Sequence, residues 1–307
     1  MRNLKVSAIK VLLLSGILAA SLLSSVNAMG PLMYDKLPNI AKDAFRAILG
    51  MCIDKNDNIY ACGDNKIKVF SRDGKEIAGW TAPSAVECLA VDKDGFVYAA
   101  GHGKVIKFSN NNKGEIIASW GTRGDGYGQI GNLSSITTHD NFVLLLDAGN
   151  SCIHKYSSDG KFIEDIGRAK KSKRGSFSTC CGIFDAAVDS KGKIYVANLG
   201  AHRVEIVDPA NPKAKKFWGQ AGDKPEEFCG CCNPTNIAIA SNGDVITSEK
   251  SIPRVKIYSP EGKLKVLIGA DNFSRDCANM FVAVDSKNNI YVVDNTANCI
   301  RVFSIAK

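Results

Sequence analysis

The sequence lacks several features that mark common protein classes. After residue 28 no long stretch has the 3.6-residue apolar period of a helix, which excludes a helical fold. The apolar run at residues 11–23 is shorter than the roughly 20 residues that span a bilayer, so it does not predict a membrane anchor. No Cys stands between this run and Cys52, which argues against a lipid-anchored N-terminus. The chain of 307 residues has only four His, so any histidine-based site would have to draw on nearly all of them.

The N-terminus has the layout of an export signal. Arg2, Lys5 and Lys10 form a basic start, the apolar run follows, and Val26-Asn27-Ala28 offers a small-residue cleavage site. We therefore expect residues 1–28 to be a signal peptide, with a mature periplasmic or extracellular protein that has no stable membrane span after cleavage. Removing three basic residues lowers the net charge from +8 to +5, which is mild. The basic run at residues 168–174 is then a solvated loop and not a nucleic-acid site, and we expect a monomer.

A repeat fills the rest of the chain. Each copy has an Asp or a small residue before a polar turn, then an apolar strand, a second turn and a third, alternating strand. The anchor positions are separated by 38, 46, 51, 51 and 45 residues, which is the period of propeller blades with several short strands each. We predict an all-β, six-bladed β-propeller over residues 44–307, anchored at Tyr60, Tyr98, Leu144, Tyr195, Ile246 and Tyr291.

The sixth repeat ends after three strands, although each blade should carry four. Its last strand pattern runs out near Ser304. A ring of blades must close or leave an exposed strand edge. We therefore predict that residues 29–43 form an N-terminal closing segment that pairs with this strand.

The stretches that join the blades resemble the NHL repeat family. Residues 120–136, WGTRGDGYGQIGNLSSI, and 218–245, WGQAGDKPEEFCGCCNPTNIAIASNGDV, are similar to the family signature W-G-x-x-G…F…P-x-x-I-A-V-D. The resemblance covers nearly the whole mature chain and implies a six-bladed NHL propeller. Residues 228–234, FCGCCNP, also resemble uncharacterised exported bacterial NHL-repeat proteins, a likeness that implies no activity. Members of the wider family include lyases, receptor-like sensors and RNA binders, so the fold does not supply the function.

Eleven Cys are present, and several of them share one repeat position. In three successive repeats a Cys lies four residues after Phe177, Phe228 or Phe273. The residue before that Cys is again able to bind a metal. In a propeller these loops lie side by side at the mouth of the central channel, so we predict that five thiols converge there: Cys180, Cys181, Cys231, Cys232 and Cys277.

We interpret this cluster as a metal-binding or redox-linked site. Thiolates prefer Zn²⁺, Cu(I) or iron–sulfur clusters, and Cys229 and Asp276 are possible additional ligands. The alternative is that the thiols pair as disulfides between loops, with Cys229 left over, in a scaffold that binds a protein or glycan without catalysis. In either case the expected partner is an exported protein or a small ligand at the channel face.

A propeller lyase is the third interpretation. The best-known enzymes of the family that this chain resembles are peptidyl-amidating lyases, in which histidines bind the zinc ion. His102, His139, His154 and His202 share no repeat position, so a site of three His is not expected here.

The remaining candidates have plainer interpretations. We expect the thiols within strand patterns to be buried like small apolar side chains. Asp185 and Asn236 either line the channel or bond neighbouring backbone, and the second is favoured. We expect Glu249, Lys250 and Arg254 to form a solvated charged hairpin. The thiols in question are Cys52, Cys62, Cys88, Cys152 and Cys299.

Overall fold

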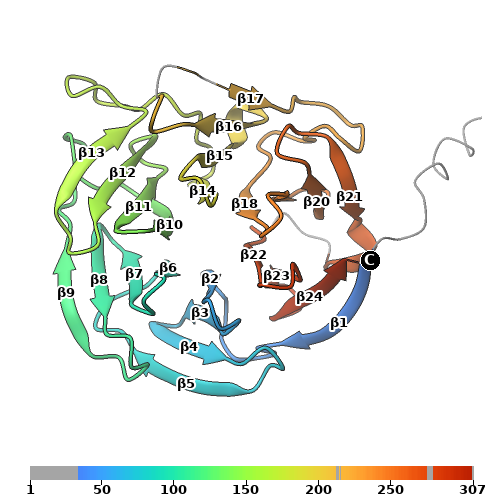
Figure 1. Cartoon of the computed structure of the whole chain (residues 1–307), viewed down its shortest axis with the longest axis horizontal. Coiled ribbons are helices and arrows are strands. Elements are labelled where there is room, and N and C mark those ends of the chain that lie inside the picture. Colours follow the sequence, from blue (N-terminus) through green and yellow to red (C-terminus); the bar gives the residue numbers. More distant parts are fainter. Residues whose placement is uncertain (1–33, 212–213, 215, 275–278, 306–307) are drawn as a thin grey trace, which may run out of the picture.

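The protein is a six-bladed β-propeller, as the repeat predicts. The computed structural model describes residues 34–211, 214, 216–274 and 279–305. Six four-stranded antiparallel sheets are arranged around a central axis, and the chain passes through them in sequence order (Figure 1). Two short 3-10 turns, Leu199–Ala201 and Ala270–Asn272, are the helical elements of the described residues.

Each blade has the same order from the axis outwards. The innermost strands are β2 (Gly50–Ile53), β6 (Cys88–Val91), β10 (Leu133–His139), β14 (Asp185–Val188), β18 (Asn236–Ile239) and β22 (Val282–Val284). The second strands are β3 (Ile59–Gly63), β7 (Val97–Gly101), β11 (Phe142–Asp147), β15 (Ile194–Asn198), β19 (Val245–Glu249) and β23 (Ile290–Asp294). The third strands are β4 (Lys66–Phe70), β8 (Lys104–Phe108), β12 (Cys152–Ser157), β16 (Arg203–Val207), β20 (Arg254–Tyr258) and β24 (Cys299–Ile305). The outer strands are β5 (Glu76–Thr81), β9 (Ile116–Trp120), β13 (Phe162–Ile166), β17 (Lys216–Trp218), β21 (Leu264–Ile268) and β1 (Tyr34–Ile40).

The ring closes through its first strand. β1 pairs antiparallel with β24, from Tyr34 opposite Ile305 to Ile40 opposite Ile300. Figure 1 shows β1 lying beside β24 on the outer edge of the last blade. This is the pairing that the truncated sixth repeat predicts. The predicted signal peptide, residues 1–28, and residues 29–33 of the predicted closing segment lie outside the described residues.

In the second and sixth blades the Asp and Tyr of the repeat hold one end of the blade together. In the second blade, Asp92 accepts the backbone N–H groups of Asp94 and Phe96, which forms the turn between β6 and β7. The hydroxyl of Tyr98 donates to the other carboxylate oxygen of Asp92 at 2.9 Å. The blade that contains Asp285 and Tyr291 repeats this arrangement. One carboxylate thus accepts the backbone N–H groups of the turn and orients the aromatic ring towards the next blade.

The hydrophobic core is divided into six clusters between neighbouring blades. One of them joins the first and last blades through Ile40, Phe45, Ile59, Val293 and Ile300. Because these clusters lie between blades, each blade is stabilised mainly by apolar burial against its two neighbours, at about 25 cal/mol per Å². The innermost strands surround a cavity of about 270 Å³ on the axis.

Candidate functional site

The three thiol-bearing loops join an outer strand to the innermost strand of the next blade. Each loop is anchored by a buried Phe, at positions 177, 228 and 273. The residue after that Phe donates its backbone N–H to the last residue of the second strand in the same blade. The pairs are Ser178 with Asn198 at 2.8 Å, Cys229 with Glu249 at 3.4 Å, and Ser274 with Asp294 at 3.0 Å. These equivalent anchors explain why the cysteines occur at equivalent positions.

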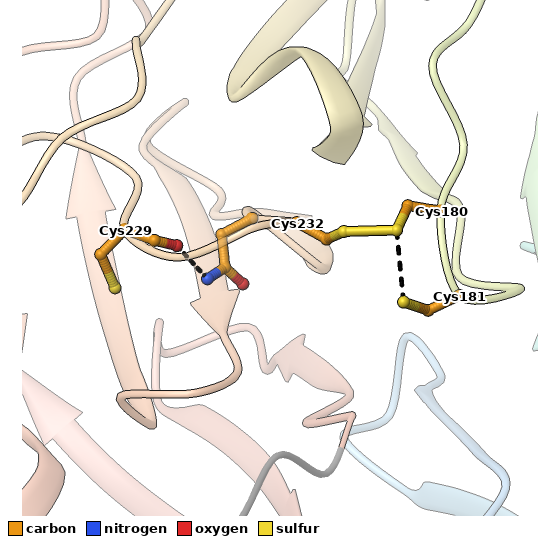
Figure 2. Close-up of a disulfide and its surroundings, with 5 residues drawn as sticks. Cys180, Cys181, Cys229 and Cys232 are labelled. Carbon is orange, nitrogen blue, oxygen red and sulfur yellow. Dashed lines mark hydrogen bonds between the residues drawn. A yellow bond between two sulfur atoms is a disulfide. The ribbon is translucent and has the colours of Figure 1, made fainter.

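Three of the predicted thiols meet between two neighbouring blades. Cys180, before β14, forms a disulfide with Cys232, before β18, and their Cα atoms are 6.4 Å apart. The sulfur of Cys181 lies 3.2 Å from that of Cys180. All three sulfur atoms lie within 4.8 Å of one another. Figure 2 shows the disulfide running between the two loops, with Cys181 beside its Cys180 end.

A tight turn places Cys181 against Cys180. The backbone N–H of Ile183 donates to the carbonyl oxygen of Cys180 at 3.0 Å, and the two central residues, Cys181 and Gly182, have φ values of 55° and 70°. Two successive positive φ values define the turn that Asn-Gly and Gly-Gly normally form. A Cys at the first position has a side chain that disfavours this backbone conformation. Its presence there brings an exposed thiol beside the disulfide.

An amide side chain fixes the other half of the site. Buried Asn233 donates through Nδ2 to the carbonyl oxygens of Cys229 at 2.6 Å and Lys250 at 3.0 Å. Its Oδ1 accepts the backbone N–H of Lys250 at 2.9 Å. These three bonds clamp the loop to the turn between β19 and β20. Cys232, next to the clamp, is only 3% exposed.

The other predicted site residues lie elsewhere or outside the described residues. Cys231 is exposed and Cys229 is buried, and neither belongs to the three-sulfur group. The Cys229 sulfur lies 3.4 Å from Oε2 of Glu249, and Figure 2 shows it pointing away from the disulfide. Cys277 and Asp276 fall in the segment 275–278, outside the described residues.

The prediction of a solvated hairpin at Glu249, Lys250 and Arg254 is wrong, because all three are buried. The carboxylate of Glu249 is fully enclosed and pairs with Nε of Arg254 at 3.0 Å and with Nζ of Lys256. Burial lowers the pKa of Lys256, while the Glu249 carboxylate acts in the opposite direction. The loop 219–235 covers these side chains. The sequence of the hairpin alone does not show that a separate loop buries it.

A second buried polar group lies in the third blade. His154 has one ring nitrogen 2.5 Å from Asp165 and the other 2.9 Å from Asp147. Burial alone would lower the pKa of His154, but the hydrogen bonds with Asp147 and Asp165 outweigh it and raise the pKa to about 11. The Cys152 sulfur is 4.0 Å and 3.9 Å from the two ring nitrogens.

Cys152, His154 and Asp165 lie close enough to share a metal ion. In this structure both ring nitrogens of His154 are bonded to carboxylates, so an ion would have to displace one of these bonds. The sequence carried a signal for this arrangement that we did not use. Four blades have a polar residue at the end of the second strand and another seven residues later: Asp147 and His154, Asn198 and Glu205, Glu249 and Lys256, and Asp294 and Arg301.

Asp185 lies at the wall of the central cavity. It is buried, and burial raises its pKa in spite of the hydrogen bonds that it accepts. Its carboxylate accepts the backbone N–H groups of Ile237 and Ala186, each at 2.9 Å, and it also faces Asn236. Asp185 and Asn236 thus line the cavity, and Asp185 bonds the neighbouring backbone as predicted.

The histidines do not form a site together. Within the part of the chain that the structure describes, neither group with metal-ligand spacing holds more than one His. His102 is 3.3 Å from Glu87, whereas His154 is in the buried group of the third blade. In the same part of the chain there is no helix with the length and apolar character needed to cross a membrane.

Comparison with known proteins shows fold similarity. No family model matches the chain. Over 201 residues it is 23% identical to the Caenorhabditis elegans protein "Probable peptidyl-alpha-hydroxyglycine alpha-amidating lyase pgal-1". The aligned region covers 63% of this chain and 53% of that protein. The chain thus spans about half the length of this curated relative.

Three solved structures share the propeller at low sequence identity. A streptogramin B lyase aligns with a TM-score of 0.59 and 11% identity, covering 89% of this chain and 97% of that one. The virginiamycin B lyase from Staphylococcus aureus gives 0.58 and 12%, with coverage of 88% and 98%. The WD40 propeller domain of Doa1 gives 0.59 and 14%, with coverage of 89% and 98%. Lyases and a WD40 domain match equally well, so the likeness concerns the fold and not the chemistry.

Proposed function

We propose that this chain is an exported NHL-type propeller that binds a soft metal ion at its channel face. Cys180, Cys181 and Cys232 are the ligands once the disulfide between the first and last of them is reduced. The observation that carries the proposal is the grouping of three sulfur atoms within 4.8 Å of one another. Two of these atoms come from one loop and the third comes from the loop of the next blade.

The spacing suits a shared ion. With metal–sulfur distances of about 2.3 Å, three sulfurs in a plane around one ion are about 4 Å apart. The three side chains therefore need only small rotations when the disulfide opens. Thiolate ligands select Zn²⁺ or Cu(I) over Mg²⁺ and Ca²⁺, so these two ions, or an iron–sulfur cluster, are the expected classes. The Cys229 sulfur contacts Glu249 in this structure, so we expect Cys229 not to be a ligand.

Export is part of the proposal. The first 28 residues have the charge and apolar layout of a cleaved signal, and a disulfide is typical of an oxidising compartment. A reversible disulfide would make ion binding depend on the redox state of that compartment. The expected partner is an exported protein or a small ligand at the channel face.

Metal analysis tests the proposal. Mature protein is reduced and desalted without oxygen, loaded with Zn²⁺ or Cu(I), and analysed for metal and for free thiols. We expect the wild type to retain a single ion, and Cys232→Ser to lose it while remaining folded. Cys231→Ser is the matched control, because that neighbouring thiol is exposed and lies outside the group. Reduced wild type that retains no more metal than Cys232→Ser contradicts the proposal and leaves the disulfide-braced binding scaffold.

The lyase similarity favours a second candidate function. The 23% identity with the amidating lyase supports an assay on a peptidyl-α-hydroxyglycine substrate. The four His of this chain do not gather into one site, which weakens that candidate. Turnover that survives loss of Cys232 would support a lyase and separate it from the thiol site.

A further inference from the structure

The cysteine cluster has an asymmetry that ion binding alone does not require. The disulfide is largely enclosed at its Cys232 end, whereas Cys181 is exposed and sits at the Cys180 end. Figure 2 shows the Cys181 sulfur beside the Cys180 end of the disulfide. At 3.2 Å the Cys181 sulfur is in contact with that of Cys180.

We propose that Cys181 is the entry thiol through which an external dithiol reduces the half-buried disulfide. In the first step the Cys181 thiolate attacks the Cys180 sulfur. A bond forms between Cys180 and Cys181, the bond between Cys180 and Cys232 breaks, and Cys232 leaves as a thiolate that takes up the proton lost by Cys181. No net oxidation occurs in this step.

The second step uses two electrons and two protons from the dithiol. It attacks the new Cys180–Cys181 disulfide, becomes a disulfide itself, and leaves both residues as thiols. Adjacent residues have Cα atoms about 3.8 Å apart, which is less than an ordinary disulfide spans. Strained and exposed disulfides are the more readily reduced ones. The exchange therefore moves the disulfide from a protected position to one that a reductant can reach.

The backbone supports a role for Cys181 beyond filling the turn. Its φ of 55° lies in the region that a Gly or an Asn occupies at lower cost. Residues held in such conformations cluster at functional sites, where the surrounding structure maintains them. Here the turn holds the thiol beside its target, so the first step is intramolecular and does not depend on a collision. The buried thiols Cys62 and Cys88 offer no competing route, because they lie in the apolar clusters between the first three blades. Burial also raises the pKa of each.

This inference rests on the proposed function in one respect: complete reduction of the disulfide yields the three free thiols that the proposed ion site needs. The exchange itself occurs in metal-free protein, and ion binding is measured in fully reduced protein. One can therefore fail while the other succeeds.

The test is the rate at which dithiothreitol reduces the Cys180–Cys232 disulfide in metal-free, oxidised mature protein. Samples are quenched in acid, labelled with a maleimide under denaturing conditions, and mapped by peptide mass. We expect Cys181→Ser to slow the appearance of free Cys232 by at least about tenfold, because the reductant must then attack the half-buried disulfide directly. Cys231→Ser should react at the wild-type rate, since that exposed thiol is not in the group.

A second variant keeps the result interpretable. Cys181→Asn suits the turn better than Ser, and its backbone should be at least as stable as that of the wild type. It should show the same slow reduction if the thiol itself is required. A wild-type rate in either Cys181 variant overturns the proposal. Equal slowing in Cys231→Ser also overturns it, because the effect would then not belong to the thiol in contact with the disulfide.

Discussion

Four blades end their second strand on a polar residue whose side chain contacts a polar side chain of the third strand. In two of them the pair is an acidic residue with a basic one: Glu249 with Lys256 and Asp294 with Arg301. In the third blade His154 stands at the cation position. Desolvated carboxylates need such partners, because an unpaired buried charge is expensive. By analogy with those blades we expect His154 to be protonated, which agrees with the pKa that its bonds to Asp147 and Asp165 raise.

The pH dependence of stability tests this assignment. Below about pH 6.5 His154 is protonated in both the folded and the unfolded chain, and its contribution to folding is complete. Between that pH and the folded pKa of about 11, only the folded state keeps the proton. The free energy of unfolding should therefore fall as the pH rises, by about 1.4 kcal/mol per pH unit from this group.

The measurement compares wild type with His154→Gln by urea unfolding from pH 6 to pH 10. At the acid end we expect the variant to be less stable by about 3 kcal/mol, because two buried carboxylates lose their cation. The difference between the two proteins should shrink above neutral pH by about 1.4 kcal/mol per pH unit, so that it vanishes at about pH 8–9. A difference that stays constant over this range would mean that His154 is neutral in the folded protein.

At the scale of elements, β1 has a different task from the other outer strands. The other five follow directly from the third strand of their own blade, whereas β1 joins the two ends of the described chain. Tyr34 packs edge-on against Phe303, and its hydroxyl oxygen accepts from Nδ2 of Asn272 at 2.7 Å. Ile40 enters the cluster between the first and last blades. Sheet pairing and two interblade clusters therefore depend on one strand.

Deleting β1 should prevent stable closure of the ring. A chain that starts at residue 44 should aggregate or unfold, because β24 would expose an unpaired edge and the apolar side chains beneath it. A chain that starts at residue 33 is the control and keeps the strand. Size-exclusion chromatography and near-ultraviolet circular dichroism compare them, and a peptide of residues 29–43 added to the shorter chain should restore part of its fold. A monomeric and equally stable shorter chain would show that closure does not need β1.

At the scale of the whole molecule, the disulfide adds a connection between the loops of two neighbouring blades. The blades already share an apolar cluster that includes Tyr195, Phe228, Ile237 and Tyr258. The linked cysteines are separated by 52 residues in the chain. Closing a loop of that length in the unfolded state corresponds to about 4 kcal/mol by the chain-entropy estimate. The cross-link therefore stabilises the ring as well as placing three sulfurs together.

Reduction of the disulfide should lower the free energy of unfolding by about 2–4 kcal/mol in chemical denaturation. If the three released thiols bind an ion, adding it at a hundred times its dissociation constant should restore about 2.7 kcal/mol. The Cys180→Ser, Cys232→Ser double variant should match the reduced wild type and show no response to the ion. Restoration in the double variant would place the ion elsewhere, and no response in reduced wild type would favour a purely structural disulfide.

The sequence alone determined the architecture, because the features that define it are local and repeated. An Asp, a turn and a Tyr recur in register, and each unit needs a neighbour to bury its apolar face, so their spacing leads to six blades and to closure by an earlier strand. The positions of the thiols in equivalent loops were also visible in that register.

Only the tertiary structure decided which of those thiols meet and which charges are buried. Cys232, and not Cys231, reaches Cys180 because Asn233 clamps its loop to the turn after β19. Glu249 is enclosed because the same loop folds over it. Both outcomes depend on hydrogen bonds between segments distant in the chain, and the direction of a side chain in an irregular loop follows from such contacts and not from a local period.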